Sequence, residues 1–402
     1  MQDSSLLTTT LGSLTLKNPF LLSSAPSTAN GEMIRRAFKA GWGGAVIKTI
    51  TPDDMPIRDV SPRFSAWKGD CNELLGFENI ELLSKHSVSY WMDEIKAIKK
   101  EYPEHQLIAS IMGSTDPISW QNLAEVVQDA GCDAIEMNVS CPHGMPEAGI
   151  GAAIGQNPQM VQELTKMVVA VSDVPVYVKL TPNVTDIGHI ARSAALGRAD
   201  GISAINTVGC MIGVDIETFE PRPNVHGRST YGGYSGPAIK PIGLRMVSEI
   251  ARTVPLPIMG IGGISRWEDA VEYILLGASA VQVCTAVMWN GYGIVREMKK
   301  GLTEYLARRG YSSPEELRGK TLSRLSSHQA LDRFVCIRPV VRNPGACIRC
   351  GRCAIACRDG GYSAIQMKKE GIEIDNGSCD GCGLCILVCS TKTLTAELCS
   401  HK

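Results

Sequence analysis

Two cysteine runs toward the C-terminal end of the chain have the spacing needed to hold metal clusters. Each run reads C-x2-C-x2-C-x3-C, over residues 347–357 and 379–389. This spacing is typical of a pair of [4Fe–4S] clusters, in which the fourth cysteine of each run reaches across to the other cluster. It predicts one cluster on Cys347, Cys350, Cys353 and Cys389, and a second on Cys379, Cys382, Cys385 and Cys357.

Zinc is the alternative ligand for these cysteines, because zinc sites are also built from C-x2-C pairs. A zinc site needs only four ligands and often includes histidine, whereas neither run contains one. The pattern therefore favours iron–sulfur clusters, although Arg358 and Ser390 stand where proline usually follows the last cysteine. Clusters of this kind carry single electrons, so the remainder of the chain should hold an electron acceptor.

Polar residues collect at the ends of the apolar, β-rich segments that precede the cysteine runs. Gly262-Gly263 lies before a helical segment, and Thr285 follows the last β segment. In a barrel the loops after strands 7 and 8 bind phosphate through backbone N–H groups. A glycine pair alone is often only a turn, but a buried Lys179 also needs an anionic or acceptor partner. Together with the clusters these residues indicate a phosphate-bearing redox cofactor, and a flavin fits because it can take single electrons and pass on a hydride.

A repeated strand–helix pattern must position these residues. It predicts strands over 19–24, 44–49, 107–112, 133–138, 176–180, 201–206, 257–262 and 280–285. Helices are predicted over 31–40, 90–101, 117–130, 158–172, 186–197, 240–253, 267–276 and 291–308. Near-continuous apolar strands that alternate with helices indicate a parallel sheet buried on both faces. The number of units predicts an α/β fold of the (β/α)8 TIM barrel type, with a doubly wound open sheet as the alternative.

The pattern also predicts how the chain divides. Residues 1–308 should form the barrel, 309–340 a connector, and 341–402 a ferredoxin-like domain with two clusters. Two connections, 51–89 and 207–239, are long and follow the C-terminal ends of strands, where barrel active sites are built. We expect them to act as lids or binding loops.

Composition and charge favour a soluble cytoplasmic protein. Lys and Arg total 40 and Asp and Glu 41, a balance that suggests neither nucleic acid nor a membrane surface as partner. No signal peptide or membrane-spanning apolar run of ~20 residues is evident. The cysteines outside the runs lack the spacing of a disulfide framework, and we expect free thiols in a reducing compartment. These are Cys71, Cys132, Cys141, Cys210, Cys284, Cys336 and Cys399.

The string Asn138-Val-Ser-Cys141-Pro at the end of the fourth predicted strand resembles the signature of the dihydroorotate dehydrogenase-like flavin barrels. Longer strings resemble the FMN and ferredoxin portion of the dihydropyrimidine dehydrogenases, of the bacterial type in which this portion is a separate catalytic subunit. They lie at 33–38, 40–43, 60–63, 79–82, 138–145, 179–186 and 229–236. The resemblance covers nearly the whole chain.

The resemblance implies a role for particular residues. The residues that match FMN-binding positions are Ser24, Lys48, Thr49, Lys179, Gly236, Ile261, Gly262, Gly263, Cys284 and Thr285. The residues that match pyrimidine-binding positions are Asn79, Glu81, Asn138, Ser140, Asn206 and Thr207. A uracil ring alternates N–H donors and carbonyl acceptors, which asparagine amides complement well.

Cys141 takes the part of catalytic acid in the reaction that the resemblance implies, the reduction of the 5,6 double bond of uracil or thymine. A hydride would pass from flavin N5 to C6, and Cys141 would protonate C5 from the opposite face. Lys179 would stabilise negative charge on the reduced flavin. Cys141 could instead be a small buried apolar residue, and His143 could tune Cys141, order the segment 144–156 or be merely structural.

The source of electrons is expected on another chain. No nicotinamide- or FAD-binding domain is evident, because the glycines at 260–263 belong to the phosphate site. The resemblance implies a partner subunit that carries FAD and oxidises NAD(P)H, and hence a hetero-oligomer. A dihydroorotate dehydrogenase or another flavin ene-reductase is the alternative, although Glu81 stands where an orotate carboxylate would need a cation. A non-enzymatic electron carrier is a further alternative.

Overall fold

The computed structural model describes residues 4–55, 57–141 and 149–400. The chain divides into two compact units, Met1–Arg324 and Leu325–Lys402. Across the described ranges, no helix combines the length and the apolar character that crossing a bilayer requires.

The first unit is built on a closed barrel of parallel strands, so the predicted TIM barrel is confirmed and the open sheet is excluded. The strands are hydrogen-bonded in the order β10-β13-β14-β3-β4-β7-β8-β9. Each predicted strand is present, most of them with slightly shifted ends. Their bounds are β3 Phe20–Leu22, β4 Gly44–Val46, β7 Gln106–Ile111, β8 Ala134–Asn138, β9 Val176–Leu180, β10 Gly201–Ala204, β13 Ile258–Ile261 and β14 Ala280–Val283.

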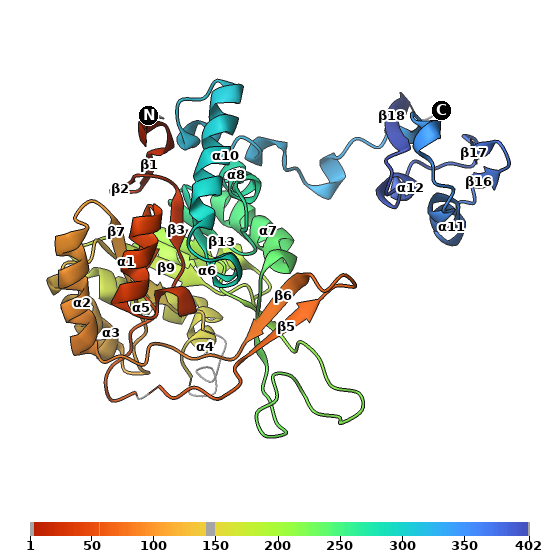
Figure 1. Ribbon diagram of the computed structural model, residues 1–402. Coiled ribbons are helices and arrows are strands. Elements are labelled where there is room, and N and C mark those ends of the chain that lie inside the picture. The colour runs from red at the N-terminus through yellow and green to blue at the C-terminus, as the bar shows by residue number, and fades with distance from the viewer. Residues whose placement is uncertain (1–3, 56, 142–148, 401–402) are drawn as a thin grey trace. The chain divides into compact units, whose positions relative to one another are not determined.

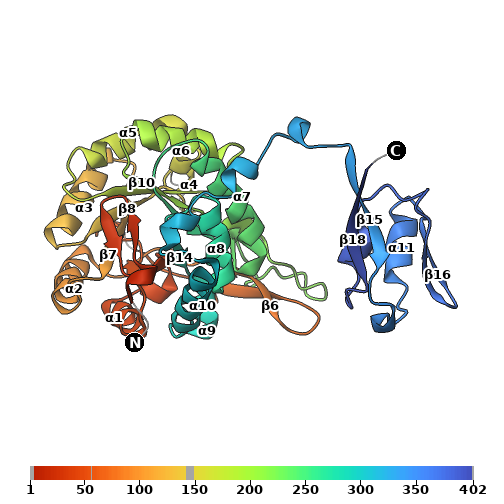
Figure 2. The ribbon, with the colours of Figure 1, turned by 90° about the horizontal axis from the view of Figure 1, so that it is seen from above.

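Helices surround these strands, as the view from above shows (Figure 2). They are α1 Gly31–Ala40, α2 Val88–Glu101, α3 Pro117–Asp129, α5 Pro158–Val169, α6 Ile187–Leu196, α7 Lys240–Ala251, α8 Trp267–Leu275 and α10 Ile294–Arg309. Several begin at a side-chain N-cap, such as Asn30, whose Oδ1 accepts from the Met33 N–H at 3.0 Å. The short helices α4 (Ala152–Gly155) and α9 (Thr285–Asn290) were not predicted, because neither is long enough to show a helical period.

Side chains inside the barrel change from apolar to polar along the strands. An apolar layer, closed by the hairpin β1 (Thr9–Leu11) and β2 (Leu14–Leu16), contains Leu21, Val46, Ile108, Ala134, Tyr177, Met259 and Ala280. Side chains alternate across a strand, so the residue two positions further on points to the same side. At those positions stand the buried polar residues Ser23, Lys48, Ser110, Glu136, Lys179 and Gln282. The C-terminal half of the barrel interior is therefore a polar layer.

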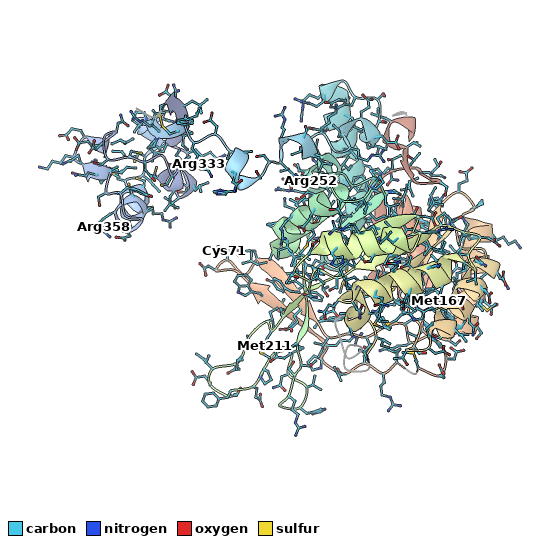
Figure 3. The ribbon with its side chains drawn as sticks, turned by 180° about the vertical axis from the view of Figure 1, so that it is seen from behind. Cys71, Met167, Met211, Arg252, Arg333 and Arg358 are labelled. Atoms are coloured by element: carbon cyan, nitrogen blue, oxygen red, sulfur yellow. A yellow bond between two sulfur atoms is a disulfide. The ribbon has the colours of Figure 1, made fainter. Side chains whose placement is uncertain are left out.

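The two long connections pair with each other. They contain the strands β5 (Phe64–Lys68), β6 (Leu74–Asn79), β11 (Val208–Cys210) and β12 (Gly232–Ser235), which form an antiparallel sheet in the order β11-β12-β6-β5. Figure 1 shows β5 and β6 as a projecting hairpin, and Figure 3 shows Cys71 at its outer end. Gly233 is opposite Asn79 in this sheet, so the two connections together position one wall of the site.

Within its described residues, the second unit contains two small antiparallel sheets and two short α-helices. Strand β15 (Val335–Val341) pairs with β18 (Leu394–Ser400), and β16 (Ile365–Lys368) pairs with β17 (Gly371–Ile374). The helices α11 (Arg352–Asp359) and α12 (Leu384–Leu387) each begin within a cysteine run.

The predicted connector 309–340 is shared between the two units. Leu317 is buried in the core of the first unit, and the Gly319 N–H donates to the Ile274 carbonyl at 2.9 Å. Strand β15 belongs to the second unit. Cys336 on β15 and Cys399 on β18 form a disulfide, so the expectation of free thiols is wrong for this pair. Sequence spacing did not reveal it because the two cysteines are brought together only by the pairing of the strands at either end of the unit.

Candidate active site

A continuous cleft lies at the C-terminal ends of the barrel strands. One part, here called the phosphate-side pocket, is lined by residues that include Gly236, Ile261, Gly262, Gly263 and Thr285. The other, the Cys141 pocket, is lined by residues that include Ser24, Lys48, Thr49, Glu81, Asn138 and Cys141. Both parts are lined by Asn79, Lys179, Asn206, Thr207 and Cys284. The structure therefore brings together every predicted FMN-binding residue, and all but one of the predicted pyrimidine-binding residues.

The phosphate-side pocket has glycines where side chains would not fit. Gly263 has φ +68°, and a Cβ there would lie 2.8 Å from the Lys240 nitrogen and 2.9 Å from the Gly236 oxygen. Gly236 also has a positive φ, of +91°. The turn is held by the Tyr273 hydroxyl, which donates to the Gly262 oxygen at 2.7 Å. A rigid glycine backbone that approaches closely fits a phosphate group.

Hydrogen bonds fix the asparagine amides of the Cys141 pocket. Asn138 Nδ2 donates to Thr49 Oγ1 at 2.9 Å, and Asn138 Oδ1 accepts from Ser140 Oγ at 2.9 Å. Asn206 Nδ2 donates to Ser140 Oγ at 2.9 Å, and Asn206 Oδ1 accepts from the Thr207 N–H at 2.8 Å. The network crosses the ends of β4, β8 and β10 and sets which way each amide faces.

Ser140 is the predicted pyrimidine-binding residue that lines neither pocket among the described residues. It is fully buried, and its hydroxyl connects the two asparagines. Ser140 therefore supports the amides of Asn138 and Asn206.

Cys141 lies three residues beyond the last residue of β8 and is 5% exposed. It lines the same pocket as Lys48, Asn138 and Asn206, so a planar ring bound there would be within reach of its thiol. His143 and the first part of the predicted segment 144–156 lie outside the described residues.

Glu81 is paired with two cations. Its Oε2 forms a close ion pair with Lys48 Nζ, and its Oε1 accepts from Arg63 Nε at 2.9 Å. The side chains of Lys48 and Glu81 are 10% and 9% exposed, and that of Arg63 is 34% exposed. Arg63 Nε also lies 3.9 Å from Asp59 Oδ2, so the carboxylates of Glu81 and Asp59 together balance Lys48 and Arg63. Glu81 is therefore not an uncompensated acid, and its presence alone does not disfavour an anionic substrate. The sequence could not show it, because Arg63 reaches Glu81 only through the fold of the hairpin.

Two buried oxygens of residues that line the cleft have no hydrogen-bond partner among the described residues. They are Gln282 Oε1 and Thr207 Oγ1, and both residues line the phosphate-side pocket. Buried polar atoms are normally paired, so these two fit a polar ligand such as a flavin or a pyrimidine. Gln282 was not among the predicted site residues, although a lone glutamine in the apolar segment Ala280–Val283 is a usable signal.

Cys284, at the boundary of both pockets, is held as a thiol. Burial raises the pKa of Cys284, and the nearby Lys179 and Lys48 only partly oppose this effect. A neutral thiol can contact a cofactor without adding charge to the cleft.

Thiols of the two cysteine runs interact with one another in the second unit, although no three side chains among the described residues are arranged to hold a metal ion. The pKa of Cys353 is raised mainly by burial and further by Cys389 and Cys350, which lie close enough to interact with it. Burial, then Cys357, Cys379 and Cys382, raises the pKa of Cys385 to about 11. Each group includes the fourth cysteine of the other run, and thiols of this kind lose their protons when they bind iron. The assignment of individual ligands stays a prediction.

Comparison with known proteins gives two family matches. Residues 6–306 match the family described as dihydroorotate dehydrogenase. Residues 342–395 match the 4Fe-4S dicluster domain.

Three relatives illustrate where the similarity lies. The NAD-dependent dihydropyrimidine dehydrogenase subunit PreA of Escherichia coli (strain K12) is 41% identical over 357 residues, 88% of this chain and 85% of that protein. The chloroplastic dihydropyrimidine dehydrogenase (NADP(+)) of Arabidopsis thaliana is 39% identical over 81% of this chain and 79% of that protein. The catalytic subunit of dihydroorotate dehydrogenase B (NAD(+)) from Pyrococcus abyssi is 40% identical over 79% of this chain and 99% of that protein. The PreA match is longer than the part of the chain before the dicluster domain, so it extends into that domain.

Proposed function

Because this chain belongs to the dihydroorotate dehydrogenase family of flavin enzymes and carries a 4Fe-4S dicluster domain, we propose that it is the catalytic subunit of a dihydropyrimidine dehydrogenase. Its reaction is the reversible reduction of the 5,6 double bond of uracil or thymine. The observation that carries this proposal is that Cys141 and the fixed amides of Asn138 and Asn206 line one pocket, in a chain that also holds the clusters.

FMN is held by the residues around the cleft. The glycine turn at 262–263 and Thr285 would take its phosphate, and Lys179, which lines both pockets, would stabilise negative charge on the reduced flavin. When bound, FMN supplies the hydride that adds to C6 of the pyrimidine. The cysteine runs take the two [4Fe–4S] clusters through which the electrons arrive.

The residues of this chain orient the pyrimidine and supply its proton. The amides of Asn79, Asn138 and Asn206 pair with the alternating donors and acceptors of the ring. A misfit that leaves one such group unpaired costs about 1–3 kcal/mol. Cys141 donates its thiol proton to C5, and in the reverse direction its thiolate accepts that proton. Cys141 is only 5% exposed, which limits the access of water to its thiol.

A partner subunit delivers the electrons. The PreA relative is named as a subunit and as NAD-dependent, and this supports an NAD(P)H-oxidising FAD subunit that feeds the clusters. Purified alone, the chain should therefore oxidise NADH only slowly, and rapid oxidation would contradict this part of the proposal.

The test of the acid role is the substitution Cys141→Ala, with Cys141→Ser as the closest isostere. Removal of a positioned general acid lowers turnover by about 10²- to 10⁴-fold, while FMN content should stay that of the parent because the substitution leaves the glycine turn and Thr285 unchanged. Turnover near the parent value with FMN fully bound would refute the assignment.

A dihydroorotate dehydrogenase is the second candidate, favoured by Lys48, a cation that lines the Cys141 pocket. Anaerobic reoxidation of the reduced protein by uracil, thymine or orotate distinguishes the two enzymes. A sample without substrate serves as the control, and reoxidation by none of the three would leave only an electron carrier.

A further inference from the structure

A buried carboxylate lies beneath the cleft and has no part in the proposed reaction so far. Glu136, on β8, is fully buried in the polar layer of the barrel interior. Its Oε1 lies 3.4 Å from Lys179 Nζ. Its Oε2 accepts from Ser203 Oγ at 2.7 Å and from Gln282 Nε2 at 2.8 Å. Both carboxylate oxygens are therefore engaged, by groups from three other strands.

The contact with Glu136 decides how Gln282 faces. A carboxylate only accepts hydrogen bonds, so the amide nitrogen of Gln282 must point to Glu136 and the amide oxygen must point away. That oxygen is the buried atom without a partner among the described residues, and Gln282 lines the phosphate-side pocket. Glu136 thus fixes the orientation of the Gln282 amide and leaves its oxygen as the acceptor that this residue can offer to a ligand.

The same carboxylate holds the Lys179 ammonium. Lys179 is 3% exposed, and its Nζ also donates a hydrogen bond to Ser23 Oγ at 3.4 Å. A buried ammonium on a flexible stem needs a counter-charge to keep one position. Lys179 lines both pockets, whereas Glu136 lines neither, so the anion is screened from the cleft by the two side chains that it orients.

We propose that Glu136 is a positioning residue that sets the electrostatics of the flavin site, holding Lys179 as its cation and Gln282 as its acceptor. It also lowers the positive potential that Lys179 exerts on the cleft, because opposite charges close together in a low-dielectric interior largely cancel at a distance. A weaker positive potential lowers the midpoint potential of the bound flavin. Glu136 therefore helps the reduced flavin to pass on its electrons. This inference rests on the proposed flavin site.

The test is the substitution Glu136→Gln, which keeps the shape and removes the charge. Sulfite adds to oxidised FMN and leaves a negative charge on the ring, so its dissociation constant reports the positive potential there. With the counter-charge gone, sulfite should bind about tenfold or more tightly, and the midpoint potential of the flavin should rise. Glu125→Gln, an equal change of charge at an exposed site on α3, is the matched control and should leave both values unchanged.

The role of Gln282 as an acceptor is tested by the substitution Gln282→Met. This substitution removes the acceptor and alters no charge, so FMN should bind about tenfold more weakly while the sulfite affinity of bound FMN stays within about twofold of the parent. FMN affinity equal to the parent's would overturn the assignment of Gln282.

The remaining outcomes separate positioning from packing. Sulfite affinity of Glu136→Gln equal to that of the parent, with FMN bound, would overturn the proposal for Glu136. If Glu136→Gln does not retain FMN, Glu136→Asp decides: recovery of FMN binding supports a role of the charge, and failure of both variants shows a packing role and overturns the proposal. Sulfite titration needs no pyrimidine, so a parent protein that binds FMN and sulfite but reduces no pyrimidine would refute the proposed function and not this inference.

Discussion

Replacement of Glu81 by glutamine should change which pyrimidines the cleft accepts. In the structure the Glu81 carboxylate pairs with both Lys48 and Arg63. Glutamine cannot balance either cation, so the surroundings of Lys48 and Arg63 become more positive. Orotate carries a carboxylate and uracil does not, and only orotate should gain from the change.

The magnitude follows from Coulomb's law. Two unit charges about 5 Å apart interact by about 3 kcal/mol at an effective dielectric constant near 20. Arg63 is 34% exposed, so solvent screens part of this energy, and about 1–2 kcal/mol should remain. That corresponds to a roughly 5- to 30-fold increase in the affinity for orotate relative to uracil.

The assay is anaerobic titration of the FMN-loaded protein with orotate and with uracil, read from the change in the flavin absorbance. Glu73→Gln is the matched control, since Glu73 is exposed between β5 and β6 in the same hairpin. A ratio of the two affinities that stays within twofold of the parent's would refute the reasoning and show that these side chains do not face the substrate. The gain should also shrink as salt is added.

Three further predictions address other parts of the chain. Gly263→Ala should weaken FMN binding about tenfold or more, because its Cβ would meet backbone atoms at a positive φ. Gly291→Ala is the control, since Gly291 also has a positive φ, of +79°, but a Cβ there would have nothing within 4 Å. Equal FMN affinity in both variants would contradict the phosphate site. Cys389→Ser should perturb the same cluster as Cys353→Ser, and Cys357→Ser the other one, as resolved by electron paramagnetic resonance; a shared effect of Cys353→Ser and Cys357→Ser would refute the crossed ligand sets. Burial, followed by Lys17 and Lys99, lowers the pKa of His105 to about 4, so the unfolded chain binds more protons than the folded one between that value and about 6.5. The free energy of unfolding should therefore fall as the pH is lowered through this range, and a denaturant titration of His105→Gln should show a smaller fall.

The sequence alone determined the features that depend on local pattern. The cysteine spacing led to the two clusters, because cluster ligation requires a fixed short spacing within one run. The alternation of apolar strands with helices led to the barrel, because parallel strands buried on both faces need apolar residues at every position. It also located the strand ends at which Lys48, Asn138, Lys179 and Asn206 meet.

Only the tertiary structure decided which charges face one another inside this frame. The sequence indicates an acid at Glu81, and the structure shows that this acid is paired with Lys48 and Arg63. Glu136 and Gln282 are far apart in sequence and meet only because the barrel closes. The two long connections form one sheet, and Cys336 meets Cys399 across paired strands. A sequence pattern reports which residues are buried, but partners that are distant in the chain are set by strand register and closure, and these are properties of the whole fold.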